Sequence, residues 1–461
     1  MKRSFLLLAL GFLLTGCIYT PEAEISEPVS TISNTVVQGT SVALEDALAE
    51  MYSLMADIGP GTRFAHKSIK SVDLIKGGEF TNSTTRSRSR PVDSLVYLVN
   101  FNEGGFAVLA ADERLDPVIA LASGGRMIRE NFTLTVNNVI QPLNIDDLWV
   151  EEDEDYLLGG IQPDDSGYFI GNAIINYALR QIINPASTPE RPEEPVDPAL
   201  DGPTYVEEWV VNENATVRKL LETNWHQKSP FNDQCPVMVN LRAPAGCVAI
   251  AVMQLMAYYE YPVVDSFNGA GTAVTWNDLR TSTLLPTNLN DAAGARTAAA
   301  AIALHAGKGC KTKYDFFGTT QSFATPANAK KYLKGLGYNV NKYNSYYENK
   351  IFSEVRAGRP VFIGAMSGAV NGHAWVIDGY MERLKNRIKI TSGGIRTIVR
   401  TGISKQSLVH CNWGWMGSCD GYYVSKVFDL EKGPEDTDPG EIGGTDSINF
   451  SWWFRTVTAS R

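Results

Sequence analysis

The chain has 461 residues, of which 44% are hydrophobic and 10% aromatic, and this composition is typical of globular rather than disordered proteins. The length exceeds what one hydrophobic core normally supports, so it predicts two or three domains. The formal net charge of −10 disfavours nucleic acid as a partner, because phosphate binding requires clustered Lys and Arg.

The first residues have the pattern of an export signal. Two basic residues precede a mostly apolar run over residues 4–14, which is shorter than the roughly 20 residues that a membrane-spanning helix needs. The run ends in Leu-Thr-Gly-Cys at residues 14–17, which resembles the bacterial lipobox, where the cysteine is lipidated and becomes the new N-terminus. We therefore expect residues 1–16 to be a lipoprotein signal peptide and Cys17 to carry a lipid anchor to a membrane. An ordinary signal peptide that contains a cysteine is the alternative.

The segment after the signal is polar and rich in Thr, Ser, Glu and Pro. Residues 17–40 therefore read as a flexible tether between the lipid anchor and a folded body. Ile18, and not an acidic residue, follows Cys17. We accordingly expect delivery to the bacterial outer membrane as a lipoprotein, or an extracellular location after processing.

Residues 41–183 have the mixed pattern of a small α+β domain. In chain order, the expected elements are a helix over 42–55, strands over 95–99 and 105–111, an apolar stretch over 118–121 and a helix over 168–183. The tripeptide Asn-Glu-Gly between the two strands has the chemistry of a hairpin turn.

The clearest boundary is a Pro-rich segment at residues 184–205. Prolines stand there among Glu, Asp and Ser, so we expect an extended, solvated linker that is open to proteolysis. A passive linker is the commonest role for such a segment. From residue 206 to residue 461 the composition is globular again, which predicts a second domain.

The cysteines and histidines do not predict a structural metal site or a disulfide scaffold. Six cysteines in a chain of this length are too few for such a scaffold, and their spacings match no zinc-binding pattern. The five histidines are scattered. We therefore expect neither a metal nor a cofactor.

Cys247 stands at the start of the most strongly patterned helix in the chain. The apolar spacing predicts about four helical turns that begin after Gly246 and stop before Pro262. The helix is apolar nearly all round, so it should be buried. A thiol in the first turn faces unpaired backbone N–H groups and the positive end of the helix dipole, which favour the reactive thiolate. On a pattern of this kind alone, an inert buried cysteine is the commoner interpretation.

His373 is the candidate base for such a thiol. It follows Gly372 and opens a predicted strand over 374–380, where an imidazole can face a cleft. Its separation from Cys247 is close to the roughly 130–150 residues between the Cys and the His of papain-like enzymes. Further on, Asn412 has an amide oxygen that can accept from the imidazole, and Trp413 can shield that hydrogen bond from water.

Three motifs in this order resemble the streptopain family of bacterial cysteine peptidases, which have a papain-like fold. They are Gly-Cys-Val-Ala at 246–249 before a long apolar helix, Gly-His-Ala-Trp-Val-Ile-Asp-Gly at 372–379, and Asn-Trp-Gly-Trp at 412–415. The resemblance covers most of residues 206–461 and includes Trp-His-Gln at 225–227. Upstream, Gly-Phe-Ala-Val-Leu-Ala-Ala-Asp at 105–112 is similar to the inhibitory prodomain of that family.

The resemblance implies an α+β architecture, with a papain-like catalytic domain at 206–461 and an inhibitory prodomain at 41–183. It implies that Cys247 attacks the peptide carbonyl and that His373 acts as base and then as acid. Asn412 and Trp413 would orient or cover the imidazole. The remaining implied roles concern the oxyanion, which the backbone N–H of Cys247 and the side chain of Gln227 would hold.

One residue departs from the family pattern. Met416 stands where the family usually has Gly, a departure that bears on substrate preference rather than on catalysis.

We therefore predict a secreted cysteine endopeptidase made as a zymogen. It would hydrolyse peptide bonds in protein or peptide substrates through a Cys–His thiolate mechanism, with its own prodomain as inhibitor. One alternative is a Cys–His amidase or acyltransferase that acts on cell-wall or small amide substrates. A binding module or an inactive peptidase is less favoured, because candidates for nucleophile, base and orienting group are all present.

Overall fold

The computed structural model describes residues 41–77, 94–132, 158–159, 166–183, 204–238, 241–267, 274–281, 294–314, 322–341, 345–367, 371–391, 393–428 and 452–461. These residues all fall within one compact unit of the chain. The predicted signal peptide, Cys17 and the tether lie outside the described residues, as does most of the Pro-rich linker. Among the described helices, none combines the length and the apolar character that a membrane span requires.

The region upstream of the linker contains the elements that its pattern predicts, together with β1, η2 and β5, which the pattern did not predict. They are α1 (Leu44–Ile58), β1 (Ile69–Ile75), β2 (Val96–Phe101), β3 (Phe106–Ala110), β4 (Val118–Ala122), the 3-10 turn η2 (Arg129–Asn131), β5 (Leu158–Gly159) and α2 (Ser166–Ile183). Both predicted helices and both predicted strands are confirmed, with ends shifted by a few residues. The apolar stretch over 118–121 is strand β4. The hairpin between β2 and β3 is also confirmed, and Gly104 in its turn has a positive φ of 77°.

The region downstream of the linker contains the larger set of elements. They are β6 (Thr204–Val211), η5 (Glu213–Ala215), β7 (Val237–Met238), β8 (Leu241–Arg242), α3 (Cys247–Tyr259), η6 (Val264–Ser266), α4 (Trp276–Thr281), α5 (Ala295–Gly309), β9 (Phe323–Ala324), α6 (Pro326–Gly335), β10 (Asn339–Val340), α7 (Glu348–Arg356), β11 (Val361–Ser367), β12 (Asn371–Ile390), β13 (Arg396–Asn412), β14 (Gly421–Val424), η7 (Ser425–Val427) and β15 (Trp452–Ser460). The strand predicted over 374–380 is the first half of the longer β12. Within β12, the register toward β13 shifts between Ile377 and Gly379.

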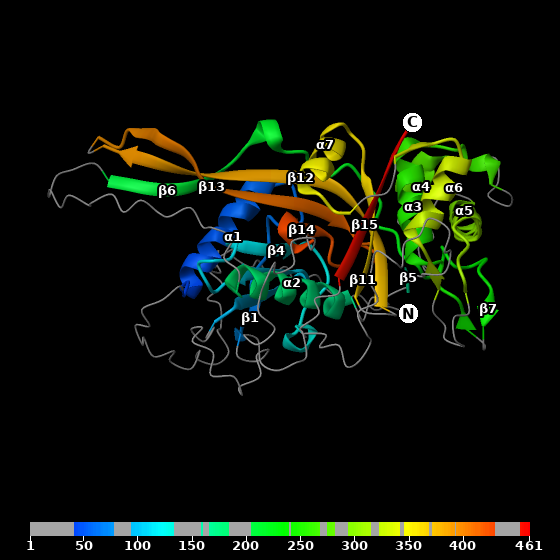
Figure 1. The fold of residues 1–461 in the computed structure, drawn as a ribbon, viewed down its shortest axis with the longest axis horizontal. Helices are drawn as coiled ribbons and strands as arrows, with labels where there is room; N and C mark the ends of the chain where they lie inside the picture. Colours follow the sequence, from blue (N-terminus) through cyan, green and yellow to red (C-terminus); the bar gives the residue numbers. More distant parts are fainter. Residues whose placement is uncertain are drawn as a thin grey trace, which may run out of the picture. The chain divides into compact units, whose positions relative to one another are not determined.

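One antiparallel sheet runs through both regions (Figure 1). Its strand order among the described residues is β1-β2-β3-β4-β14-β13-β12-β11-β15-β10, and β6 pairs with the outer half of β12. The junction is the pairing of β4 with β14, where Gly421 lies opposite Ala122. A Cβ atom on Gly421 would come within 2.2 Å of the carbonyl oxygen of Leu121, so only glycine allows this approach.

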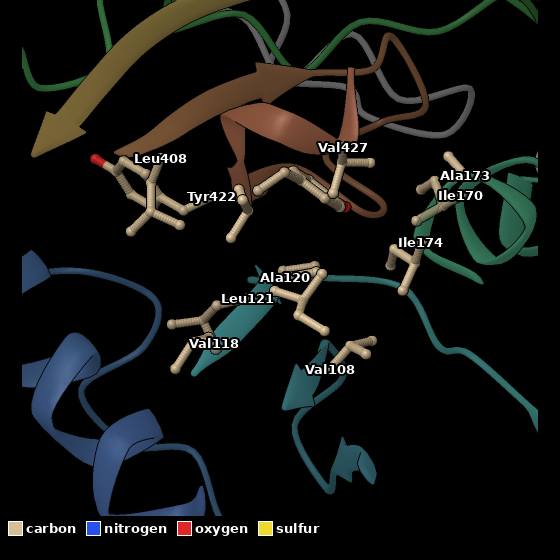
Figure 2. Close-up of a cluster of buried hydrophobic side chains, with 14 of the residues drawn as sticks. Val108, Val118, Ala120, Leu121, Ile170, Ala173, Ile174, Leu408, Tyr422 and Val427 are labelled. Carbon is tan, nitrogen blue, oxygen red and sulfur yellow. The ribbon is translucent and has the colours of Figure 1, made fainter. Parts of the chain in front are cut away.

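Buried apolar side chains fill the space on both sides of this junction. Figure 2 shows Val118 and Leu121 of β4 together with Leu408 of β13 and Tyr422 of β14. Ile174 of α2 belongs to the same cluster and is fully buried. Burial of each such side chain stabilises the folded state by roughly 1.5–3 kcal/mol. The two regions therefore share a substantial core. The α+β class predicted from the sequence is confirmed.

Candidate active site

Cys247 is the first residue of α3, and its side chain is 2% exposed. Gly246 immediately before it has a φ of +97°, a conformation that favours glycine. The helix is buried on all sides from Cys247 to Ala257, as its apolar pattern predicts. The sulfur accepts a hydrogen bond from the backbone N–H of Ala374, the residue that follows His373. The nucleophile helix therefore packs directly against the strand that carries the candidate base.

The thiol of Cys247 is protonated at neutral pH in this state. Burial raises its pKa to about 11, although nearby backbone N–H groups act in the opposite direction. The N–H groups at the helix start do lower the pKa, as expected, but burial outweighs them, so the thiolate is not the favoured form here. Loss of hydration destabilises the charged sulfur more than the helix N-terminus stabilises it.

His373 is the third residue of β12, near the strand end that the sequence predicted, but its side chain is fully buried and does not face an open cleft. Its Nε2 is 2.8 Å from the carbonyl oxygen of Trp413. A carbonyl oxygen only accepts hydrogen bonds, so Nε2 carries the proton and Nδ1 is the free acceptor. Nδ1 has no hydrogen-bond partner among the described residues. The imidazole is thus held in the tautomer that leaves Nδ1 available as a base.

Four aromatic side chains surround the imidazole, and we call them the aromatic cage. Trp415 stacks on His373 with ring centroids 4.3 Å apart, while Trp375 and Trp413 lie parallel to it at 6.2 Å. Phe169 of α2 completes the cage in a T-shaped contact at 6.1 Å. Burial within these rings lowers the pKa of His373 to about 3, so the imidazole is neutral at physiological pH.

The side chain of Asn412 makes its hydrogen bonds to groups other than His373. Its Nδ2 donates to the carbonyl oxygen of Thr223 at 2.6 Å, and its Oδ1 accepts from Gln254 Nε2 at 2.7 Å. The same Oδ1 accepts from the backbone N–H of Gly414 at 3.2 Å. That N–H belongs to the peptide group whose carbonyl oxygen binds His373. Asn412 therefore holds the peptide group that orients the imidazole.

The group that hydrogen-bonds to the base is the main-chain carbonyl of Trp413, whose indole ring only stacks on the imidazole; the Asn412 amide makes no hydrogen bond to it. Sequence reasoning named Trp413 for its side chain and missed the carbonyl. No sequence signal distinguishes one main-chain carbonyl from another, because every residue has one.

Gln227 is buried and lies beside the turn that precedes the nucleophile. Its backbone carbonyl accepts from the N–H of Ala245 at 2.9 Å, two residues before Cys247. Its side-chain Oε1 has no hydrogen-bond partner within the described part of the chain. The backbone of Gln227 is thus tied to the turn that leads to Cys247, and the role of its side chain toward an oxyanion stays a prediction.

Two upstream elements reach this site. Strand β5 pairs with β9 and contacts α3, β11 and β12, so its backbone lies beside both the nucleophile helix and the strand of the base. Helix α2 supplies Phe169 to the aromatic cage. In this structure, β5 and α2 from the region upstream of the linker therefore lie against the site.

The described residues offer no group of three or more His, Cys, Asp or Glu side chains that could hold a metal ion. Their five cysteines are all free and buried: Cys235, Cys247, Cys310, Cys411 and Cys419.

Comparisons with known proteins agree with the motifs. Residues 225–423 match the model of the Peptidase C10 family. Streptopain from Streptococcus pyogenes is 26% identical over 245 residues, which cover 45% of this chain and 55% of streptopain. The chain thus spans about half the length of the curated relatives it matches.

Two solved structures are also similar. A prointerpain A fragment from Prevotella intermedia is 19% identical, with a TM-score of 0.41. The match covers 85% of this chain and 98% of the fragment. Active wild-type interpain A, a cysteine protease from the same organism, is 23% identical, with a TM-score of 0.33 and coverages of 53% and 94%.

The resemblance to the streptopain family is confirmed for residues 225–423, which include all five predicted catalytic positions: Gln227, Cys247, His373, Asn412 and Trp413. By sequence, this region resembles cysteine-type peptidases.

Proposed function

We propose that this chain is a cysteine endopeptidase synthesised as an inactive precursor. One observation carries the proposal: the hydrogen bond from His373 Nε2 to the Trp413 carbonyl leaves Nδ1 as proton acceptor, next to the helix that begins at Cys247. A buried thiol and a tautomerically fixed imidazole on adjacent elements are the parts that thiol acyl transfer requires.

In the active state, His373 Nδ1 removes the proton from Cys247 Sγ, and the sulfur attacks the carbonyl carbon of the substrate peptide. The C–N bond breaks when the imidazolium returns this proton to the leaving amine. Water then hydrolyses the thioester and releases the thiol. The backbone N–H of Cys247 and the side-chain amide of Gln227 stabilise the oxyanion in both steps.

Residues 41–183 act as the inhibitory prodomain in this proposal. Three contacts support the assignment: β5 lies beside both the nucleophile helix and the base strand, Phe169 closes the aromatic cage, and β4 extends the downstream sheet at β14. The buried, neutral states of Cys247 and His373 fit an inactive precursor.

Cleavage within the Pro-rich linker at 184–205 would end the inhibition. A tethered inhibitor acts at an effective concentration of roughly millimolar, and cutting the tether removes that advantage. The upstream region would then be able to dissociate and open the site.

The test is self-conversion of the full-length chain, followed on a gel together with casein digestion. Cys247→Ala should lose activity by about 1000-fold or more and should persist uncut. Cys235→Ala is the matched control, because it removes another buried free thiol and should convert normally. Undiminished casein digestion by Cys247→Ala would refute the peptidase mechanism.

The same preparation separates the peptidase from a Cys–His amidase or acyltransferase. A peptidase cleaves casein and internal peptide bonds of long peptides. Turnover of small amides without any cleavage of protein would favour the alternative.

We further propose that the precursor is exported and lipidated at Cys17, with delivery to the outer membrane or release after processing. The export-signal pattern of residues 1–16, the lipobox-like sequence and Ile18 after Cys17 support this part. Labelled fatty acid should enter the wild-type chain but not Cys17→Ser, and equal labelling of both would refute the anchor.

A further inference from the structure

Asp420 is a buried carboxyl group that the proposed mechanism does not use. Its side chain points back to the start of the loop that follows β13, and Oδ1 accepts from the backbone N–H of Trp413 at 2.8 Å. The loop returns on itself between these two residues through hydrogen bonds from Ser418 N to Trp415 O at 3.0 Å and from Asp420 N to Gly417 O at 3.4 Å.

The hydrogen bond to Asp420 completes a set that fixes the backbone around Trp413. The N–H of Trp413 donates to Asp420, and the next N–H, that of Gly414, donates to Asn412. Between these two donors lies the carbonyl of Trp413, which accepts from His373. Two side chains therefore determine where this carbonyl points, and the carbonyl determines where the imidazole lies.

The environment of Asp420 does not explain the carboxyl group as a source of stability. Burial raises its pKa to about 7, although Trp413 N–H, His410 and Arg63 act in the opposite direction; Asp378 raises it further. A buried carboxyl with a raised pKa disfavours folding at neutral pH relative to an uncharged residue of the same shape. The position is better explained by the backbone geometry that its oxygen fixes.

The turn that contains Asp420 also meets the upstream region. The carbonyl of Asp420 accepts from the N–H and the hydroxyl of Ser123, at 2.8 and 3.1 Å. The N–H of Cys419 donates to the carbonyl of Gly124 at 3.0 Å. The turn is thus well ordered by contacts that do not involve the carboxyl group, so the carboxyl can be removed without removing these contacts.

We propose that Asp420 is a positioning residue for His373, acting through the backbone of Trp413. The inference rests on the proposed function, in which His373 is the catalytic base. An oxygen acceptor at this position, rather than a negative charge, is what the geometry requires. Asp420→Asn keeps that acceptor, whereas Asp420→Ala removes it.

The first test does not depend on activity. In the full-length Cys247→Ala chain with 15N-labelled histidine, NMR should show His373 with a proton fixed on Nε2, assigned by its loss in His373→Gln. Adding Asp420→Ala should abolish this signature or average the two tautomers, and adding Asp420→Asn should retain it. Asp112→Ala is the control, because Asp112 is also a buried carboxyl that accepts a backbone N–H, yet it lies outside this loop.

The second test measures turnover of the converted enzyme per titrated active site. Asp420→Ala should lower kcat by about 10- to 100-fold with little change in KM, and Asp420→Asn should stay within about threefold of wild type. An unchanged His373 signature together with unchanged kcat in Asp420→Ala would overturn the inference. A wild-type chain without peptidase activity whose His373 signature still depends on Asp420 would refute the proposed function and leave the positioning role standing.

Discussion

Phe169 of α2 packs against His373 of β12 in a T-shaped arrangement, with ring centroids 6.1 Å apart. The same phenyl ring makes T-shaped contacts with Trp375 at 5.9 Å and with Trp413 at 6.1 Å. A single side chain from upstream of the linker therefore closes the aromatic cage. The three indoles come from downstream elements. Dissociation of the upstream region would therefore remove Phe169 from the aromatic cage and leave the indoles in place.

Phe169→Ala should make the precursor convert faster than wild type. Truncating a buried Phe typically costs about 3–5 kcal/mol of folding stability. Here the substitution also removes the ring contact that keeps His373 enclosed. We expect self-conversion of the full-length chain, followed on a gel, to accelerate by at least about tenfold. Phe101→Ala is the matched control, because Phe101 is also buried in the upstream region but makes no ring contact with His373. Equal acceleration by both variants would show general destabilisation instead.

Cys247 should react slowly with iodoacetamide in the precursor at neutral pH. Its pKa is raised to about 11 by burial, so little thiolate exists at pH 7. The rate, measured by mass spectrometry on the full-length chain, should rise as the pH increases toward about 11. After conversion, labelling at pH 7 should be fast, while Cys235 should label as slowly as before. Rapid labelling of the uncut precursor at pH 7 would contradict the enclosed, neutral thiol described here.

The precursor should lose stability in acid because of His373. Burial lowers the pKa of its imidazole from 6.5 to about 3. Between these two pH values, the imidazole is therefore protonated in the unfolded state but neutral in the folded state. The stability linked to this group is present above pH 6.5 and is lost as the pH falls toward about 3. Urea unfolding of the Cys247→Ala chain should show this slope, and adding His373→Gln should reduce it. Identical pH slopes with and without His373 would be inconsistent with a buried neutral imidazole.

Asp420 should make a contribution of the opposite sign. Its pKa is raised from 3.8 to about 7, so between these values the folded state holds a proton that the unfolded state has lost. Stability linked to Asp420 therefore falls as the pH rises from about 4 to about 7. Asp420→Asn should gain stability relative to its parent over that window in the same unfolding experiment. A constant difference between the two chains from pH 4 to pH 7 would argue against a buried carboxyl group.

The sequence predicts those features of the fold and the site that depend on residues close together in the chain. The apolar run after Gly246 predicts both the buried helix α3 and the position of Cys247, and the order of motifs identifies His373. Met416 illustrates a local departure that the backbone explains. Its φ of +59° lies in the left-handed region that glycine adopts at less cost, so the conformation accounts for the family's usual Gly.

Other features leave no local pattern because they depend on pairs of distant residues. The pairing of Ala122 with Gly421 joins the two predicted domains in one sheet, although neither residue is distinctive in sequence. The burial that raises the pKa of Cys247 comes from tertiary packing, so an argument from the helix start alone could not predict the net direction of the shift. The contact of Phe169 with His373 likewise could not be read from the sequence, since an apolar helix can bury its face against many partners.

Arg383 of β12 and Asp57 of α1 form a further link between the two regions. Nε of Arg383 donates to Asp57 Oδ2 at 2.7 Å, and its Nη2 donates to Ser53 Oγ at 2.7 Å. The guanidinium is fully buried, and burial disfavours the charged form of both partners, raising the pKa of Asp57 and lowering that of Arg383. Such a pair adds little net stability while intact, but the removal of one partner leaves a buried charge without compensation.

Asp57→Ala should therefore destabilise the Cys247→Ala chain by about 3 kcal/mol, as measured by urea unfolding. In the chain that retains Cys247, it should also accelerate self-conversion. The substitution weakens the contact between α1 and β12, the strand that carries His373. Glu213→Ala is the matched control: it removes a carboxylate from an exposed ion pair with Arg218, where solvent screens the charges, and should leave both measurements nearly unchanged. If Asp57→Ala unfolds like its parent, α1 is not held to β12 by this pair. If it is destabilised but converts at the wild-type rate, the α1 contact stabilises the fold without restraining the active site, and the restraint lies with Phe169 and β5.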